Sequence, residues 1–130
     1  MAKKPSIVIA LGGNAISKPG KHAGLPDQFY ATNESMQHVA DLVVNGYEKI
    51  LVAHGNGPQV GAAMLRSEIA EKAVYPHTLD VADAETQGSM GYMIQQTLTN
   101  CLRERGIKKP VATVVTQVVV DVNDLSLIHI

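Results

Sequence analysis

The 130-residue sequence lacks tryptophan and has few other aromatic residues, one phenylalanine and four tyrosines. Proteins that bind single-stranded nucleic acid stack bases on aromatic side chains, so this scarcity argues against that function. The single cysteine, Cys101, excludes a disulfide framework within the chain and is typical of a reducing compartment. A formal net charge of −1, with basic residues scattered along the chain, also argues against binding to a phosphate backbone.

Long apolar runs are scarce as well. No run approaches membrane-spanning length and no charged-then-apolar leader opens the chain, so we expect a cytoplasmic protein without membrane contact. Hydrophobic residues make up 45% of the chain and charged residues 18%, which is typical of a globular protein. The length suits one domain with a real core.

Apolar patterning predicts alternating strands and helices. Strands are predicted at residues 6–11, 49–53 and 111–120, each a short apolar run. Helices are predicted from Thr32 or Asn33 to a stop at Gly46, from Pro58 to about Lys72, and from about Leu79 to Arg105, where Gly106 ends the last. Residues 17–31 are predicted to form a loop. This order favours an open α/β sheet with parallel strands.

Two glycine-rich stretches each follow a predicted strand: GGNA at residues 12–15 and HGNGPQVG at residues 54–61. Open α/β sheets bind ligands at the carboxyl ends of their strands. Glycine lets the backbone approach a ligand, and backbone N–H groups at such turns attract anions. Either loop alone is more simply explained as a tight turn. Two on successive strands predict a site for a substrate with two anionic ends or for a phosphoryl group in transfer.

Two common nucleotide motifs do not match these loops. A P-loop ending at Lys21 would need glycine at Ala15 and serine or threonine at His22. The stretch GNGPQVG has three residues before its last glycine, where the dinucleotide fingerprint has two, and Pro58 removes one N–H donor. A dinucleotide-dependent oxidoreductase is therefore disfavoured.

Four ordered stretches resemble the amino-terminal half of carbamate kinase, of the amino-acid kinase superfamily. They are VIALGGNAI, ILVAHGNGPQVG, ETQGSMGYMIQQTL and VATVVTQVVVD, and the resemblance spans about residues 7–124. Many relatives have a lysine immediately before LGG, whereas Ala10 at this position is similar to the carbamate kinase branch. The resemblance implies a three-layer αβα sandwich with a mainly parallel open sheet, here truncated to its amino-terminal half.

The resemblance also implies a reaction and a set of site residues. The reaction is reversible phosphoryl transfer between carbamoyl phosphate and ADP, giving ATP and carbamate, with Mg²⁺, in a homodimeric enzyme. Positions that match the family's phosphoryl cradle are Gly12, Gly13 and Asn14. Those that match the carbamate-binding loop are Gly55, Asn56 and Gly57, and Gln59 is expected to bond this loop or its ligand. Asn56 is equally well explained as a turn residue.

Several further residues have mainly structural interpretations. His54 is expected to be a structural hydrogen-bonding residue rather than a titrating group. Gln87, Gly88 and Gly91 are expected to provide close helix packing beneath the loops. Asp83 and Glu85 are predicted to be solvated helix charges. Polar residues at the end of the predicted third strand, Thr116 and Gln117, are expected at the same sheet edge. Met93, Leu98 and Leu102 are expected to form ordinary core, and the resemblance implies that part of this apolar helix face contributes to the homodimer contact.

The resemblance covers only part of a carbamate kinase. Carbamate kinases are more than twice as long, and their other half supplies the nucleotide pocket and the basic catalytic residues. We therefore expect residues 1–124 to be the carbamate- and phosphoryl-binding part, and residues 125–130 (LSLIHI) to be a tail foreign to the family. We also expect the chain alone to be inactive. Two alternatives stay open: another acyl-phosphate transferase of the superfamily, and a non-catalytic anion-binding fragment.

Overall fold

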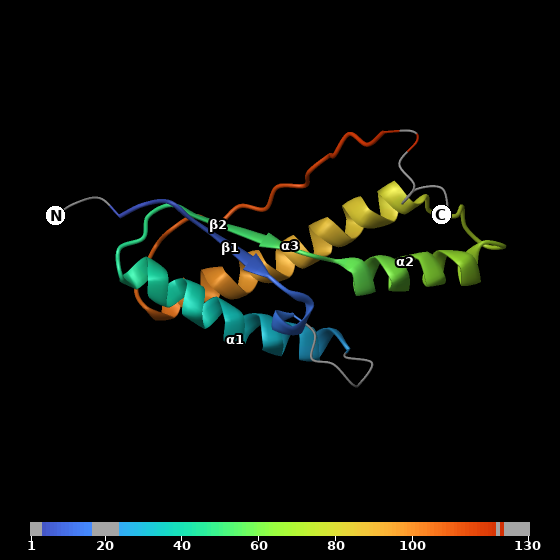
Figure 1. The fold of residues 1–130 in the computed structure, drawn as a ribbon. Helices are drawn as coiled ribbons and strands as arrows, with labels where there is room; N and C mark the ends of the chain where they lie inside the picture. The colour runs from blue at the N-terminus through green and yellow to red at the C-terminus, as the bar shows by residue number, and fades with distance from the viewer. Residues whose placement is uncertain (1–3, 17–23, 122, 124–130) are drawn as a thin grey trace.

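The computed structural model describes residues 4–16, 24–121 and 123. The elements in chain order are β1 (Ile7–Leu11), the short 3₁₀ turn η1 (Gly13–Ala15), α1 (Leu25–Val44), β2 (Ile50–His54), α2 (Gly57–Ala70) and α3 (Leu79–Glu104). The two strands lie side by side and point in the same direction (Figure 1). The predicted α/β class with parallel pairing is confirmed.

The register of the two strands places their carboxyl ends level with each other. Leu11, the last residue of β1, pairs with His54, the last residue of β2. Side chains alternate between the two faces of the sheet, as strand geometry requires. Ile9 and Val52 pack against the core, whereas Val8 and Leu51 on the other face are 72% and 56% exposed.

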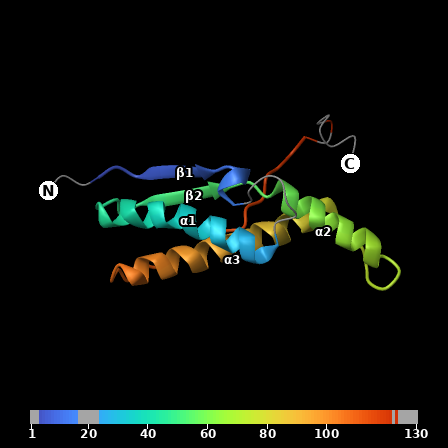
Figure 2. The same cartoon turned by 90° about the horizontal axis from the view of Figure 1, so that it is seen from below.

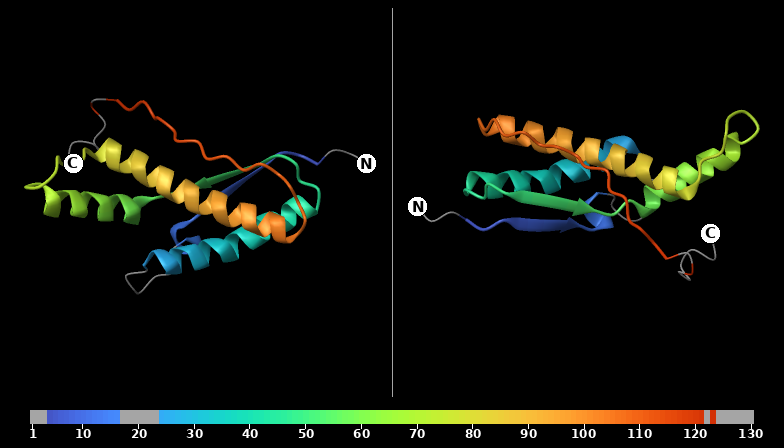
Figure 3. Two further views of the ribbon diagram at one scale, coloured as in Figure 1. Left: turned by 180° about the vertical axis from the view of Figure 1, so that it is seen from behind. Right: turned by 90° about the horizontal axis from the view of Figure 1, so that it is seen from above.

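Helices α1 and α3 cover one face of this sheet. Viewed from below and from above, both strands lie on one side of α1, and α3 lies on the other side (Figures 2 and 3). Helix α2 extends beyond the carboxyl end of β2 and packs on the first half of α3 (Figure 1). Within the described residues, the loops at the ends of β1 and β2 therefore lie where sheet, α1 and α2 meet.

The core fills the space between α1, α3 and the sheet. Met36 and Ala40 of α1 and Leu102 of α3 are almost fully buried and belong to one apolar cluster, which β1 and β2 complete. Cys101 is buried in the same cluster, and this burial raises the pKa of its thiol. A smaller cluster joins Ile16, Met90 and Met93 beneath the first glycine loop.

The first helix begins earlier than predicted. Helix α1 starts at Leu25, so residues 25–31 are helical rather than part of a loop, and Thr32 is a buried helical residue instead of a cap. Pro26 sits in the first turn, where its missing N–H group costs nothing. The Asp27 carboxylate accepts a hydrogen bond from the Gly24 N–H at 3.2 Å and so closes this end.

Residues 111–120 do not form the predicted third strand. They run extended in the direction of β2 and lie over α3 (Figures 1 and 3), but among the described residues only β1 and β2 form a ladder. β-Branched side chains favour extended backbone, which is present, yet pairing also needs a neighbouring strand edge within hydrogen-bonding distance. Side chains of α3 bind the segment instead, through Gln87 and Gln95.

The other predicted boundaries agree with the structure. Gly46 and Gly106 follow α1 and α3 with φ angles of +88° and +73°, the left-handed conformation that ends many helices. Predicted core residues Met93, Leu98 and Leu102 are 3%, 7% and 1% exposed, so they pack inside the chain rather than at a dimer contact. Among the described residues, no helix is long and apolar enough to cross a membrane.

Candidate active site

The two glycine loops emerge from the same edge of the sheet. The first begins at Gly12, immediately after β1, and the second at Gly55, immediately after β2. Since Leu11 and His54 are register partners in adjacent parallel strands, the loops start side by side. This is the edge at which open α/β sheets bind their ligands. The structure thus brings together the two stretches that the sequence singled out.

The first loop folds back on itself as a 3₁₀ turn. The Ala15 N–H donates to the Gly12 carbonyl at 3.0 Å, and the Ile16 N–H donates to the Gly13 carbonyl at 3.1 Å. A turn of this kind leaves its first N–H groups without an internal acceptor. The Ser35 hydroxyl of α1 donates to the Ala15 carbonyl at 3.0 Å and ties the turn to α1. The side chain of Asn14 lies outside the described part of the structure.

The second loop leads directly into α2. Asn56 precedes the helix, and its carbonyl accepts hydrogen bonds from the N–H groups of Gln59 and Val60, at 3.0 and 2.9 Å. Gly57 and Pro58 form the first helical turn, whose free N–H groups and dipole favour a negative charge. The loop therefore presents a positive helix end beside the first loop.

Glycine at these loop positions is not required by the folding of the described chain. The backbone at Gly12, Gly13, Gly55 and Gly57 avoids positive φ angles, so an L-amino acid could adopt the same conformation. A Cβ atom built at each of the four would meet no atom within 4 Å. By contrast, Gly46 and Gly106 need their left-handed φ angles. The open space at the loop glycines fits the approach of a ligand.

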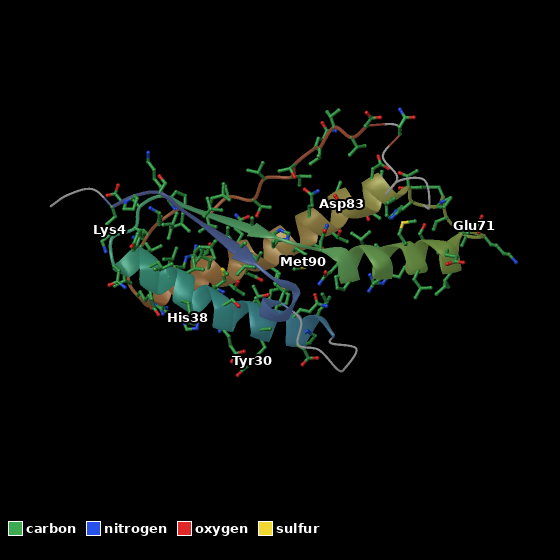
Figure 4. All side chains as sticks on the ribbon, viewed as in Figure 1. Lys4, Tyr30, His38, Glu71, Asp83 and Met90 are labelled. Carbon is green, nitrogen blue, oxygen red and sulfur yellow. The ribbon has the colours of Figure 1, made fainter. Side chains whose placement is uncertain are left out.

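The Asn56 side chain is bound to α3. Its Nδ2 atom donates to Asp83 Oδ1 at 2.8 Å and to Thr86 Oγ1 at 2.9 Å, and lies 3.3 Å from the Asp83 carbonyl. Asp83 was expected to be a solvated charge, and this prediction is wrong. It is half-buried, and it lies on the amino-terminal half of α3 (labelled in Figure 4).

Gln87 extends this contact to the segment that follows α3. Its Nε2 atom donates to Asp83 Oδ2 at 2.7 Å, and its Oε1 atom accepts from the Thr116 N–H at 2.9 Å. Asn56, Asp83, Gln87 and Thr116 thus form one hydrogen-bond chain, which we call the Asn56–Thr116 chain. Sequence reasoning did not predict the central role of Asp83 in these contacts. The signal that could have indicated it is the helical spacing that places Asp83, Thr86 and Gln87 on one face of α3.

Two glycines of α3 that were expected to pack beneath the loops behave differently from each other. A Cβ atom on Gly91 would lie 2.1 Å from Thr113 Cγ2, so glycine is needed there for the close approach of residues 110–116. A Cβ atom on Gly88 would meet nothing within 4 Å. Gly91 therefore has a packing role, with the following segment rather than the loops as its partner, and Gly88 has none in the described chain.

The remaining candidates make local contacts. His54 Nδ1 lies 3.3 Å from the carbonyl oxygen of the adjacent Gly55. Gln59 Nε2 donates to Gln28 Oε1 of α1 at 3.3 Å and so connects the starts of α2 and α1. Thr116 is held by Gln87 and lies outside the ladder that β1 and β2 form. Lys4 lies at the opposite end of β1, with its Nζ 4.6 Å from the Tyr47 ring centre (Figure 4).

A groove of about 760 Å³ runs along β2, between this strand, α3 and residues 109–116. Its polar lining includes His54, Asn56, Asp83 and Gln87, and most of the rest is apolar. The described residues contain no cluster of three His, Cys, Asp or Glu side chains that could hold a metal ion.

Comparison with known proteins confirms the resemblance drawn from the motifs. No protein-family model matches the chain. It is 45% identical over 120 residues to the carbamate kinase of Thermococcus kodakarensis and 45% identical over 122 residues to carbamate kinase 2 of Enterococcus faecalis. These alignments cover 91% and 92% of the chain, but 38% of each relative.

The fold agrees with this result. The structure of carbamate kinase from Giardia lamblia bound to AMP-PNP superposes with a TM-score of 0.89 and 31% identity, over 95% of this chain and 39% of that one. The described fold is thus an α/β arrangement of the carbamate kinase type. The chain is homologous to carbamate kinases and spans about two fifths of their length, consistent with an amino-terminal portion.

Proposed function

We propose that this chain is the carbamate- and phosphoryl-binding part of a carbamate kinase. The reaction would be reversible phosphoryl transfer between carbamoyl phosphate and ADP, giving ATP and carbamate. The observation that carries this proposal is the pair of glycine loops at one sheet edge, each with open space where a side chain would stand. The homology to carbamate kinases supports the choice of reaction.

In this proposal the two loops divide the substrate between them. Gly12, Gly13 and Asn14 surround the phosphoryl group, whose negative charge spreads over its oxygens during transfer. Gly55, Asn56 and Gly57 bind the carbamate end, with Gln59 supporting their loop through α1. Backbone N–H groups suit this task because the fold has already oriented them, so little reorganisation accompanies the reaction.

The nucleotide and its Mg²⁺ belong to the remaining part of such an enzyme in this proposal. A nucleotide-bound Mg²⁺ takes most of its ligands from phosphate groups and water. We accordingly expect the 130-residue chain alone to bind carbamoyl phosphate without catalysing ATP synthesis.

Paired glycine substitutions test the proposal. Gly13→Ala and Gly57→Ala place a methyl group in space that the chain leaves open, so we expect the fold to be kept and carbamoyl phosphate binding to weaken at least tenfold. Gly61→Ala on α2 is the matched control, because its added methyl group also meets nothing within 4 Å. Binding is measured by titration with carbamoyl phosphate while backbone amide resonances are followed by NMR. Unchanged affinity in both loop variants would contradict the proposal.

Activity is tested on a completed enzyme. The chain is fused to the remaining part of the Thermococcus kodakarensis carbamate kinase, and ATP formation from carbamoyl phosphate and ADP is measured. We expect activity in the fusion and none in the 130-residue chain. A substrate panel on the same fusion tests the alternative acceptor chemistry within the superfamily, for which Ala10 in place of lysine is the unfavourable observation. Activity with another acyl phosphate and none with carbamoyl phosphate would favour that alternative.

We also propose a homodimer for the complete enzyme. Met93, Leu98 and Leu102 of α3 are buried within the chain, so a dimer would use other apolar residues. Leu65 and Ile69 on α2 are 56% and 77% exposed, and Tyr75 in the following connector is 81% exposed. Sedimentation analysis of the fusion with and without Ile69→Glu tests this surface: we expect the dimer to weaken in the variant.

A further inference from the structure

The orientation of the Asn56 side-chain amide is set by hydrogen bonds that allow one direction only. The Thr116 backbone N–H can only donate, so it takes the oxygen Oε1 of Gln87. This leaves the Gln87 Nε2 group facing Asp83 Oδ2. The Asp83 carboxylate is an acceptor, and its other oxygen accepts from Asn56 Nδ2.

Thr86 supports the same orientation. Its hydroxyl hydrogen is donated to the carbonyl oxygen of Ala82 at 2.8 Å, or of Asp83 at 3.0 Å. The Thr86 oxygen therefore faces Asn56 as an acceptor, 2.9 Å from Nδ2. Both hydrogens of the Asn56 amide are thus used by α3, one by Asp83 and one by Thr86. The assignment follows from donor and acceptor chemistry, whichever atom of the amide is labelled nitrogen.

The Asn56 oxygen is the group left for a ligand. No described residue donates a hydrogen bond to Asn56 Oδ1, and the residue lines the groove beside the second glycine loop. A substrate group that meets this oxygen gains a hydrogen bond only if it carries an N–H or O–H donor. A methyl group in the same place would leave the oxygen without a partner.

We propose that Asp83 is a positioning residue that turns the Asn56 amide so that its oxygen selects substrates carrying an N–H donor at the carbonyl carbon. This inference rests on the proposed function and names the part of the substrate that the second loop recognises. The carbamoyl group has such an NH₂ group, whereas the acetyl group has a methyl group of similar size. Carbamoyl phosphate and acetyl phosphate therefore form a matched pair of ligands.

The variant Asp83→Asn reverses the amide without removing the contact. Gln87 Nε2 still needs an acceptor, so the new side chain turns its oxygen toward Gln87 and its NH₂ group toward Asn56. Asn56 then accepts with its oxygen, toward which the Thr86 hydroxyl can rotate as a donor, and presents its own NH₂ group to the ligand. Asp80→Asn is the control, because it removes the same charge from an exposed position one turn earlier on α3. Asp83→Glu keeps the carboxylate acceptor on a side chain that is one methylene group longer.

The experiment titrates the full 130-residue chain with each ligand and follows the side-chain amide resonances of Asn56 by NMR. In the unmodified chain we expect carbamoyl phosphate to bind about tenfold more tightly than acetyl phosphate, and slow hydrogen exchange at Asn56 Nδ2. In Asp83→Asn we expect this preference to fall to about one and the exchange to accelerate. Asp80→Asn should change neither, and Asp83→Glu should keep most of the preference.

The possible failures are distinct. If Asp83→Asn keeps the preference, or if Asn56 exchange does not change, Asp83 does not position the amide. If the unmodified chain binds both ligands equally, the selecting role of the Asn56 oxygen is overturned while the proposed function stands. If it binds neither ligand, the proposed function is overturned and the selecting role with it. Thermal melting of each variant shows that these results come from folded protein.

Discussion

The two glycine loops start side by side but are anchored by different interactions. The first is fixed by an apolar side chain: Ile16, at its end, is 2% exposed and packs with Met90 and Met93. The second is fixed by polar contacts, in which Asn56 donates to two side chains of α3. Apolar packing fixes where a loop lies, whereas directional hydrogen bonds also fix which atom each side chain presents. The first loop is thus suited to binding through its backbone, and the second to selecting through a side chain.

Removing the buried Ile16 side chain, which fixes the first loop, should have the largest effect on stability. Ile16→Ala creates a cavity beneath the first loop, and we expect it to lower the free energy of unfolding by about 2–5 kcal/mol. Amide hydrogen exchange should accelerate in the first loop and remain slow around Asn56. Ile69→Ala is the control, since this isoleucine of α2 is 77% exposed and the expected change is within about 0.5 kcal/mol. An equal increase in hydrogen exchange in both loops would show that Ile16 fixes both of them.

Crowding the contact at Gly91 should disrupt the Asn56–Thr116 chain at its Thr116 end. In Gly91→Ala the added methyl group would clash with Thr113, so residues 110–116 must move from α3, at a cost of about 1–3 kcal/mol. Thr116 then no longer fixes Gln87, and we expect faster hydrogen exchange at the Asn56 side chain. Gly88→Ala, in open space on the same helix, should instead stabilise the protein by up to about 1 kcal/mol. Chemical denaturation measures both, and a similar effect of the two substitutions would contradict this explanation.

Local patterns of the sequence predicted most of the fold. Strands β1 and β2 and helices α2 and α3 follow from apolar runs, Pro58 and the stop at Gly106, all of which act within a few residues. The start of α1 was missed because Pro26 suggests a loop unless Asp27 is known to close the helix end. The third strand was predicted wrongly because pairing depends on a distant edge, and local β propensity cannot report it.

The site was predicted less completely than the fold. The glycine loops were found because their glycines are adjacent in sequence and each follows a strand. The role of Asp83 could not be found, since its partner Asn56 lies 27 residues away and a charged residue on a helix is usually solvated. The assignment of ligands to the loop glycines remains a prediction.

Removing Asn56 itself should have an intermediate effect. Asn56→Ala leaves the half-buried Asp83 carboxylate without this donor, and we expect a loss of about 2 kcal/mol in the free energy of unfolding. Gln59→Ala in the next turn is the control: its side chain makes one hydrogen bond at 3.3 Å, so we expect about 0.5 kcal/mol. Denaturant titration measures the free energy of unfolding of both variants. Equal values would show that the Asn56 contacts do not anchor the second loop.

The smallest effect is expected for the side-chain hydrogen bond between Ser35 of α1 and the first loop. Ser35→Ala removes the donor to the Ala15 carbonyl, and we expect a loss of about 0.5–1.5 kcal/mol. Since Ile16 still anchors the loop, carbamoyl phosphate affinity should change little, whereas Asn56→Ala should alter both stability and the preference for an N–H donor. Titration calorimetry on the two variants checks this contrast. A large loss of affinity in Ser35→Ala would mean that the first loop, too, depends on a directional polar contact.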